Sequence, residues 1–188
     1  MTARQIPRVL MLAARGFEDS ELYEVRTALS NSGAEVHLAS IDKNPIRGVA
    51  WDAATGISAP STVSTTPDLT FDRVDVAQYD ALVLPGGLVN PDILRTVPVA
   101  VQIVQDFMAQ NKIVAAICHA PWLLVEADVL RGRTLTSWTS IRRDLTNAGA
   151  LVVDQEVVID GNLISSRMPA DIPAFARAIS GALRALAA

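Results

Sequence analysis

The chain has 188 residues, of which 50% are hydrophobic and 19% are charged, so it is long enough to bury a core and too apolar to be intrinsically disordered. Its formal net charge of −4 offers no positive field for nucleic acid or an anionic membrane surface. The single cysteine excludes an internal disulfide and suits a reducing cytoplasm. No export signal is visible, and the longest apolar stretch, residues 113–130, contains charged side chains that argue against a membrane span. We therefore expect one cytoplasmic globular domain over residues 1–188.

The first half of the chain predicts a β-α-β unit followed by an irregular excursion. The apolar run at residues 8–14 is typical of a strand buried on both faces, and residues 36–41 predict a second such strand. Between them, residues 20–32 carry apolar side chains at helical spacing and end at Gly33, a common helix stop. A right-handed crossover should make the two strands parallel. Residues 43–70 are rich in Pro, Gly, Ser and Thr, which indicates hairpins and loops.

The second half returns to alternating strands and helices. We expect strands at residues 81–84 and 113–117, helices at 98–110, 120–125, 141–148 and 170–186, and a hairpin of 157–159 with 163–164. This alternation predicts a three-layer α/β sandwich with a mostly parallel central sheet. Ligands of such sheets bind at the carboxyl ends of the strands. Residues 16–19, residues 85–87 and the pair Cys118-His119 each follow a predicted strand, so they should meet at that edge.

Cys118 has the surroundings of a nucleophile elbow, a sharp turn between a strand and a helix. Such a turn needs small residues two positions before and after the nucleophile, and Ala116 and Ala120 stand there. The N-terminus of the following helix favours thiolate over thiol. Free cysteines are also common as inert buried residues, so the segment by itself leaves both interpretations open. His119 is the histidine placed to assist, because the other one, His37, lies inside a predicted strand.

Two further segments could complete a site around the sulfur. Glu18 is either a solvated loop acid or a partly buried carboxyl that hydrogen-bonds Cys118, with its pKa raised by burial and by the thiolate. Gly86 and Gly87, with the following Leu88, are either a tight turn or a source of backbone N–H groups for an oxyanion hole. Either way, these residues are the candidates for binding substrate beside the thiol.

The sequence carries no cofactor signature. It contains neither a G-x-G-x-x-G nor a G-x-x-x-x-G-K-[ST] loop. One cysteine and two separated histidines match no zinc spacing. We therefore expect neither a nucleotide cofactor nor a metal.

Five segments, in order along the chain, resemble the PfpI branch of the ThiJ/PfpI superfamily. They are residues 16–19 (GFED), 79–87 (YDALVLPGG), 90–95 (NPDILR), 115–121 (AAICHAP) and 160–167 (DGNLISSR). The resemblance covers nearly the whole chain. It implies a flavodoxin-like fold of the class I glutamine amidotransferase-like superfamily, built as a homodimer or an assembly of dimers.

The resemblance also implies which residues act. Related proteins use the elbow cysteine, the adjacent histidine and the acidic residue after the first strand, which are here Cys118, His119 and Glu18. In PfpI-type peptidases a glutamate from a neighbouring subunit orients the histidine, and its nearest counterpart here is Asp92. Trp138 stands where some branches carry a distant catalytic histidine, so the glutaminase mechanism, which needs such a histidine, is set aside.

Activities in the family include intracellular peptidase, glyoxalase III-like conversion of methylglyoxal, and deglycation. We expect a cysteine-dependent enzyme of the glyoxalase III or deglycase type, acting on a small reactive carbonyl or a glycated substrate. Two alternatives stay open, an intracellular cysteine peptidase and a redox-sensing stress protein that works without turnover. All three use the thiol of Cys118.

Overall fold

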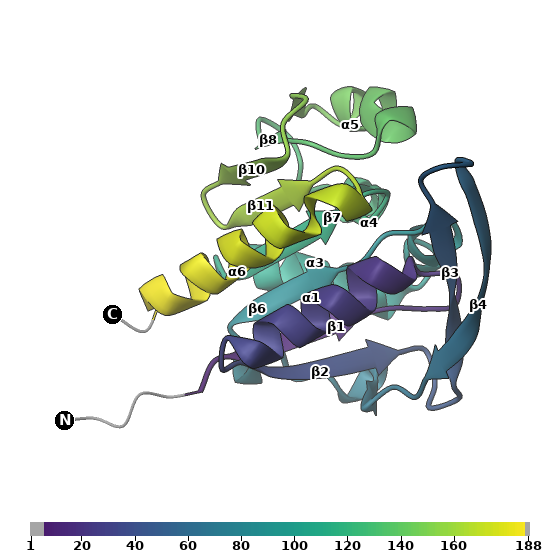
Figure 1. Cartoon of the computed structure of the whole chain (residues 1–188). Coiled ribbons are helices and arrows are strands. Elements are labelled where there is room, and N and C mark those ends of the chain that lie inside the picture. Colours follow the sequence, from purple (N-terminus) through teal and green to yellow (C-terminus); the bar gives the residue numbers. More distant parts are fainter. Residues whose placement is uncertain (1–5, 187–188) are drawn as a thin grey trace.

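A seven-stranded sheet forms the centre of the molecule, in the computed structural model that describes residues 6–186. Its strands, in the order in which they lie side by side, are β10 (Val157–Asp160), β11 (Leu163–Ser166), β7 (Ile113–Ile117), β6 (Ala81–Leu84), β1 (Arg8–Leu12), β2 (Glu35–Ser40) and β5 (Leu69–Thr70) (Figure 1). All neighbouring pairs are parallel except β10 and β11, which form the hairpin that the sequence predicts. The mostly parallel sheet is therefore confirmed.

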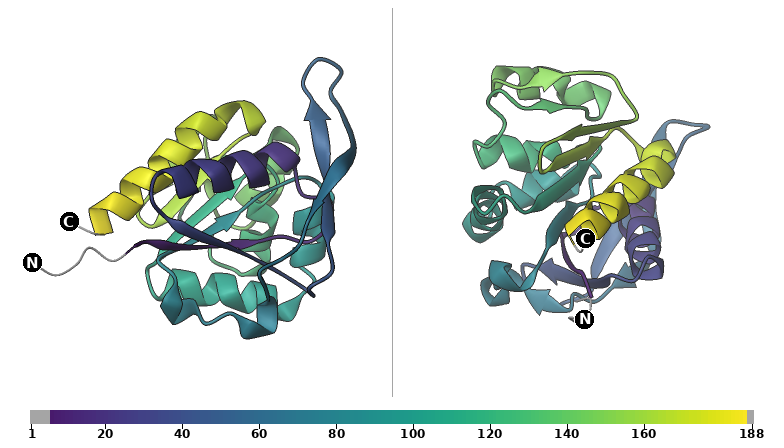
Figure 2. Two further views of the ribbon diagram at one scale, coloured as in Figure 1. Left: turned by 60° about the horizontal axis from the view of Figure 1, so that its bottom comes forward. Right: turned by 90° about the vertical axis from the view of Figure 1, so that its left-hand side faces the viewer.

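Helices cover both faces of the sheet and make the predicted three layers (Figure 2). One face carries α1 (Asp19–Asn31) and α6 (Ile172–Leu186), and the other carries α3 (Pro98–Ala109) and α4 (Pro121–Glu126). Two further short helices are α2 (Val89–Leu94) and α5 (Arg142–Asn147). The sequence does not predict α2, because six residues are too few for a periodic signal. None of the helices in residues 6–186 is long and apolar enough to cross a membrane.

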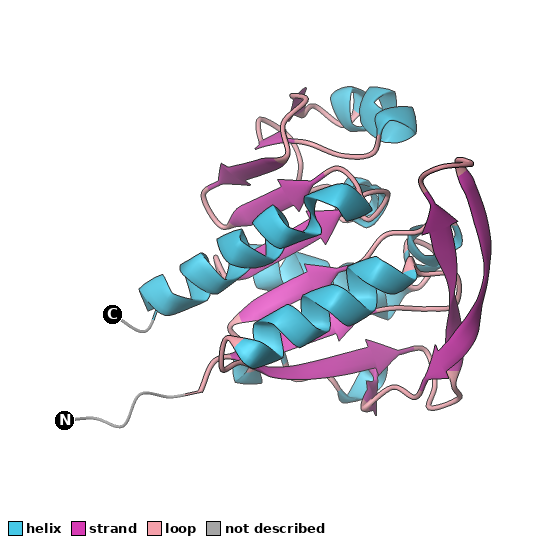
Figure 3. Cartoon of the chain, viewed as in Figure 1, coloured by secondary structure: helices cyan, strands magenta, loops and turns pink. Residues whose placement is uncertain are grey.

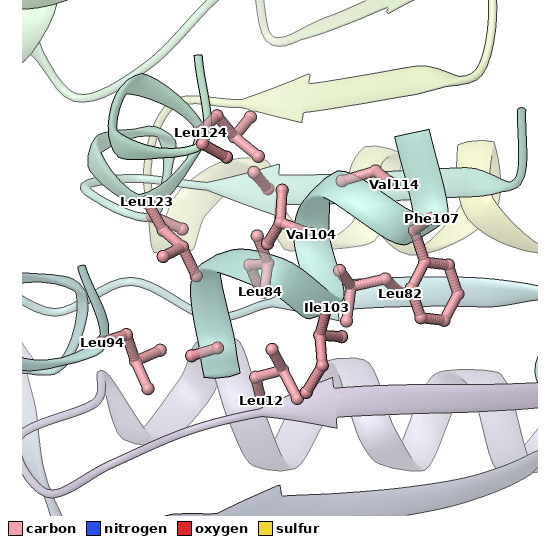
Figure 4. Packing of buried hydrophobic residues seen from close by; sticks show 14 of the residues in the cluster. Leu12, Leu82, Leu84, Leu94, Ile103, Val104, Phe107, Val114, Leu123 and Leu124 are labelled. Atoms are coloured by element: carbon pink, nitrogen blue, oxygen red, sulfur yellow. The ribbon is translucent and has the colours of Figure 1, made fainter. Parts of the chain in front are cut away.

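The alternation of side chains along β1 separates two hydrophobic cores. Leu10 and Leu12 face α3 and α4, whereas Val9 and Met11 face α1 and α6. Figure 4 shows part of the first core, in which Leu12 of β1 belongs to the same cluster as Leu82 and Leu84 of β6 and Ile103, Val104 and Phe107 of α3. Each fully buried side chain of this size contributes about 1.5–3 kcal/mol relative to exposure. Burial on both faces explains why these strands are almost continuously apolar.

The excursion at residues 43–70 contains a hairpin that stands out from the body of the molecule (Figure 3). Its strands are β3 (Ile46–Asp52) and β4 (Ile57–Thr65), which pair antiparallel. The middle of β3 is tied to the loop after β1, because the N–H of Val49 donates to the carbonyl of Phe17 at 2.7 Å. The antiparallel pairing of β3 and β4 confirms a hairpin in this excursion. The hydrogen bond of Val49 shows that β3 reaches the loop that follows β1.

The strand order places three strand ends together. The chain passes from β1 to β2 on one side and later returns to β6 on the other side of β1, with β7 next to β6. The carboxyl ends of β1, β6 and β7 are thus neighbours at a topological switch point, where open α/β sheets bind ligands. Two small strands, β8 (Thr134–Leu135) and β9 (Leu151–Val152), pair with each other outside this sheet.

Candidate functional site

Cys118 occupies a strained turn directly after β7. Its φ is +63°, a left-handed conformation that side chains other than glycine rarely adopt. The turn is held on both sides, because the N–H of Cys118 donates to the carbonyl of Ser166 at 3.1 Å and its carbonyl accepts from the N–H of Trp138 at 3.0 Å. A Cβ atom on Gly86 would lie 2.7 Å from the Cβ of Cys118, so this approach requires glycine. The predicted strand–elbow–helix is confirmed.

His119 lies against the sulfur through one ring nitrogen. Its Nδ1 is 3.1 Å from Sγ of Cys118, and its Nε2 is 3.2 Å from Oγ of Ser140. The indole of Trp138 stacks on the imidazole, with ring centres 5.6 Å apart and planes inclined by 27°. The elbow thus splays two adjacent side chains around one point, and His119 is fixed on both edges and one face.

The carboxyl group that acts on the thiol belongs to Glu21. Its side chain is fully buried, and Oε2 accepts a hydrogen bond of 2.7 Å from the N–H of Gly86. Its other oxygen, Oε1, has no hydrogen-bond partner among the described residues, and the carboxylate lies close enough to Cys118 to raise the pKa of the thiol. The sequence-based expectation gave this role to Glu18, and the structure corrects it. Helical side chains tilt toward the N-terminus of the helix, so Glu21, in the first turn of α1, points back over the end of β6.

Glu18 is also buried, at the position just before α1, but its carboxyl is used elsewhere. One oxygen accepts hydrogen bonds from Oγ of Ser20 at 3.0 Å and from the N–H of Trp51 at 3.4 Å. Burial raises the pKa of Glu18, and these hydrogen bonds act against that increase. Glu18 therefore lies in the wall of the site and joins it to β3, rather than touching the sulfur.

Backbone N–H groups from two segments lie near enough to the sulfur to lower the pKa of the thiol. They belong to Gly87, after β6, and to His119. Gly87 has a φ of +77°, and a Cβ atom there would come within 2.8 Å of the N–H nitrogen of Glu18. Gly86 and Gly87 thus pack the end of β6 against both neighbouring strand ends, while Leu88 projects outward and is 57% exposed.

Burial controls the protonation of the three reactive groups. It raises the pKa of the Cys118 thiol well above its ordinary value, the Glu21 carboxylate raises it further, and the two N–H groups lower it. Burial also raises the pKa of Glu21 to about 8 and lowers that of His119 to about 4. Near neutral pH the groups therefore rest uncharged. Burial thus opposes the thiolate that the sequence leads us to expect at this elbow.

A cavity of about 260 Å³ opens in front of the sulfur. It is lined by Glu18, Glu21, Trp51, Ser58, Gly87, Leu88, Cys118, His119, Trp138, Ser140 and Pro169. Trp51, from β3, meets Trp138 edge to face, with ring centres 5.3 Å apart. The projecting hairpin thus supplies one wall of the cavity.

Within residues 6–186, no three Cys, His, Asp or Glu side chains are grouped as metal ligands.

Asp92 lies outside this cavity. It is exposed on α2 and is not among the lining residues. The single chain therefore does not bring Asp92 to His119. A role for it across a subunit interface stays a prediction from the resemblance.

Sequence reasoning missed several residues of the cavity. Glu21 carried a usable signal, since it is an acid next to Leu22 on the apolar face of a predicted amphipathic helix. Trp51, Ser58 and Ser140 carried none, because an irregular excursion and a short turn give no periodic pattern that would place them beside Cys118.

Replacing Glu21 by glutamine is expected to lower the pH at which Cys118 becomes reactive, because glutamine keeps a hydrogen-bond donor and removes the carboxylate that opposes ionisation of the thiol. Glu18→Gln should shift the profile less, because the Glu18 carboxyl is bound to Ser20 and Trp51. Alkylation by iodoacetamide against pH measures this cleanly, since Cys118 is the only cysteine. The exposed Glu24→Gln, on the same helix, is the control. A larger shift in Glu18→Gln than in Glu21→Gln would contradict the assignment.

Known proteins resemble this chain in sequence and in fold. The sequence profile described as the DJ-1/PfpI family matches residues 7–182. The chain is 44% identical to the deglycase PH1704 of Pyrococcus horikoshii, over 90% of this chain and 95% of that protein. It is 42% identical to the deglycase PfpI of Pyrococcus furiosus, with the same coverage. The crystal structure of Drosophila melanogaster DJ-1beta superposes with a TM-score of 0.84 at 28% identity, over 95% of this chain and 91% of that one.

Proposed function

Because the chain belongs to the DJ-1/PfpI family, we propose that it is a cysteine-dependent enzyme that acts on reactive carbonyls or on their adducts, as a deglycase or a glyoxalase III-like enzyme. One observation carries the proposal. Cys118 sits in a strained elbow at the bottom of a cavity, with Nδ1 of His119 3.1 Å from its sulfur. A nucleophile with a base in hydrogen-bonding reach is the arrangement that covalent catalysis requires.

The first chemical step follows from the resting state of the site. The sulfur of Cys118 attacks an aldehyde carbon, its proton passes to Nδ1 of His119, and the electron pair of the broken S–H bond forms the S–C bond. The π electrons of the carbonyl move to its oxygen, and the protonated carboxyl of Glu21 is placed to give that oxygen a proton, which yields a neutral hemithioacetal. Backbone N–H groups of Gly87 and His119 stabilise negative charge as it develops.

The cavity supports a small substrate. Its volume of about 260 Å³ is below the roughly 300–1,000 Å³ of sites that enclose drug-sized ligands. Two indole rings, from Trp51 and Trp138, and the outward Leu88 leave its walls largely apolar. A short carbonyl compound, or one glycated side chain, fits this space better than a length of polypeptide.

A substrate panel tests the proposal. We expect the protein to convert methylglyoxal to lactate, which contains the atoms of methylglyoxal plus water, or to release the free amine from glycated N-acetyl amino acids. Alkylation of its single cysteine by iodoacetamide should stop both reactions. A fluorogenic peptide should not be cleaved.

Each alternative function has its own result in the same panel. Cleavage of the peptide without any carbonyl turnover would establish the peptidase instead. No turnover, together with a stable two-oxygen adduct on Cys118 after mild peroxide, would establish the redox sensor. The cytoplasmic location stays a prediction. The homodimer or assembly of dimers also stays a prediction, and light scattering tests it by measuring the mass of the assembly.

A further inference from the structure

We propose that Ser140 is the positioning residue of the Cys118–His119 pair, and that its hydroxyl holds the imidazole so that Nδ1 faces the sulfur. The two ring nitrogens of His119 each have one partner, Sγ of Cys118 at 3.1 Å from Nδ1 and Oγ of Ser140 at 3.2 Å from Nε2. Sulfur, imidazole and hydroxyl thus form a continuous chain supplied by one subunit. Such an orienting group is the third member that nucleophile–base pairs generally require.

The turn that carries Ser140 is built onto the elbow itself. Ser140 lies in a 3₁₀ turn at Thr139–Ile141. The residue before that turn, Trp138, donates its N–H to the carbonyl of Cys118 at 3.0 Å and stacks its ring on His119. Ile141, at the end of the turn, is fully buried. The position of the hydroxyl is therefore fixed relative to the sulfur, although Ser140 is itself exposed.

No other group of the described chain, residues 6–186, is hydrogen-bonded to Nε2 of His119. The titratable side chains that line the same cavity are Cys118, Glu18 and Glu21. Glu18 binds Ser20 and the N–H of Trp51, and Glu21 binds the N–H of Gly86, so neither carboxyl orients the imidazole.

A hydroxyl at this position suits both states of the reaction. While Cys118 is a thiol, its S–H donates to Nδ1, so Nε2 carries the hydrogen and donates to Oγ of Ser140. When the sulfur attacks a substrate, its proton moves to Nδ1 and the ring becomes a cation. The Nε2–H then makes a charge-assisted bond to the same Oγ, which is stronger than the neutral one. Ser140 thus favours the protonated ring, and it does so most when the proton is transferred.

The inference rests on the proposed function only for its effect on turnover, because alkylation of Cys118 needs no substrate. In Ser140→Ala we expect the iodoacetamide alkylation rate at pH 8 to fall roughly three- to tenfold, the loss that one hydrogen bond represents. The rate should approach that of wild type only at more alkaline pH. With a carbonyl substrate, kcat should fall by a similar factor while KM stays the same.

Matched variants separate positioning from structure. Ser140→Thr keeps a hydroxyl at an exposed site and should restore the alkylation profile. Thr139→Ala, the neighbouring exposed position, should leave it unchanged. The inference is overturned if Ser140→Ala alkylates like wild type at every pH, or if its loss is not restored by Ser140→Thr. If the alkylation pattern holds and no carbonyl is turned over, the proposed function fails and the role of Ser140 stands.

Discussion

Cys118→Ala is expected to reduce conversion of methylglyoxal, or release of amine from a glycated amino acid, to the uncatalysed rate. The loss should be at least about a hundredfold, because the variant cannot form the covalent intermediate and leaves His119 with no proton to accept. Initial rates with wild type and variant, at matched protein concentration and at several pH values, measure it.

Cys118→Ser is the control for shape, since it replaces only the sulfur by oxygen. It should be as inactive as alanine, because a hydroxyl is a far weaker nucleophile than a thiol near neutral pH. Both variants should unfold at or above the temperature at which wild type unfolds. The strain at the elbow lies in the backbone at position 118, so it is the same with alanine or serine as with cysteine. Turnover that survives in either folded variant would show that the chemistry takes place elsewhere.

Glu21→Gln is expected to stabilise the protein at alkaline pH. The pKa of Glu21 is about 8 in the folded protein, against an ordinary value of 4.5. Between these two pH values the folded protein keeps a proton on Glu21 that the unfolded chain has released. Folding stability therefore falls as pH rises from 4.5 to 8, by about 1.4 kcal/mol per pH unit and on the order of 5 kcal/mol in all. Glutamine carries no such proton, so the variant escapes this loss.

His119 has the opposite effect on folding stability over part of this pH range. Its pKa falls from 6.5 to about 4 on folding, so the folded state gains stability as pH rises between these values. In wild type the effects of Glu21 and His119 nearly cancel from pH 4.5 to 6.5, and the Glu21 loss dominates from pH 6.5 to 8. Without Glu21, the His119 gain should make the stability of Glu21→Gln rise up to pH 6.5. The raised pKa of Glu18 and, at alkaline pH, ionisation of Cys118 lower the stability of both proteins in the same way.

Urea unfolding at pH 4.5, 6.5 and 8 measures this difference directly. The advantage of Glu21→Gln over wild type should be small at pH 4.5 and should grow to several kcal/mol at pH 8. Glu24→Gln, an exposed position on α1, should run parallel to wild type throughout. Parallel curves for Glu21→Gln as well would mean that Glu21 is ionised in the folded protein at neutral pH.

Much of the fold could be predicted because its signals are local. The apolar runs of β1, β6 and β7 are buried on both faces, and the hairpin of β10 and β11 turns at Asp160-Gly161-Asn162, so composition alone indicated them. The elements that escaped are short, namely α2, β5, β8 and β9, which have two to six residues each. Tertiary contacts, rather than their own periodicity, hold such pieces in place.

The residues of the candidate site also fall into those that local sequence signals indicate and those that they do not. Cys118 and His119 are adjacent in sequence, and the small residues around them are local, so the sequence indicated the elbow and the pair. The acid could not be assigned by position in the loop. Glu18 and Glu21 are only three residues apart, and the start of α1 between them decided which carboxyl turns toward Gly86, 65 positions farther along.

By itself, then, the sequence determined a mostly parallel α/β sheet with a cysteine elbow and an adjacent histidine, because small residues and apolar runs act over a few positions. Only the tertiary structure decided that the carboxyl of Glu21 acts on the thiol, that Oγ of Ser140 bonds Nε2 of His119, and that Trp51 lines the cavity. It also decided the resting charge of the site. Burial comes from elements distant in sequence, and burial is the largest effect on the pKa values of Cys118, Glu21 and His119 alike.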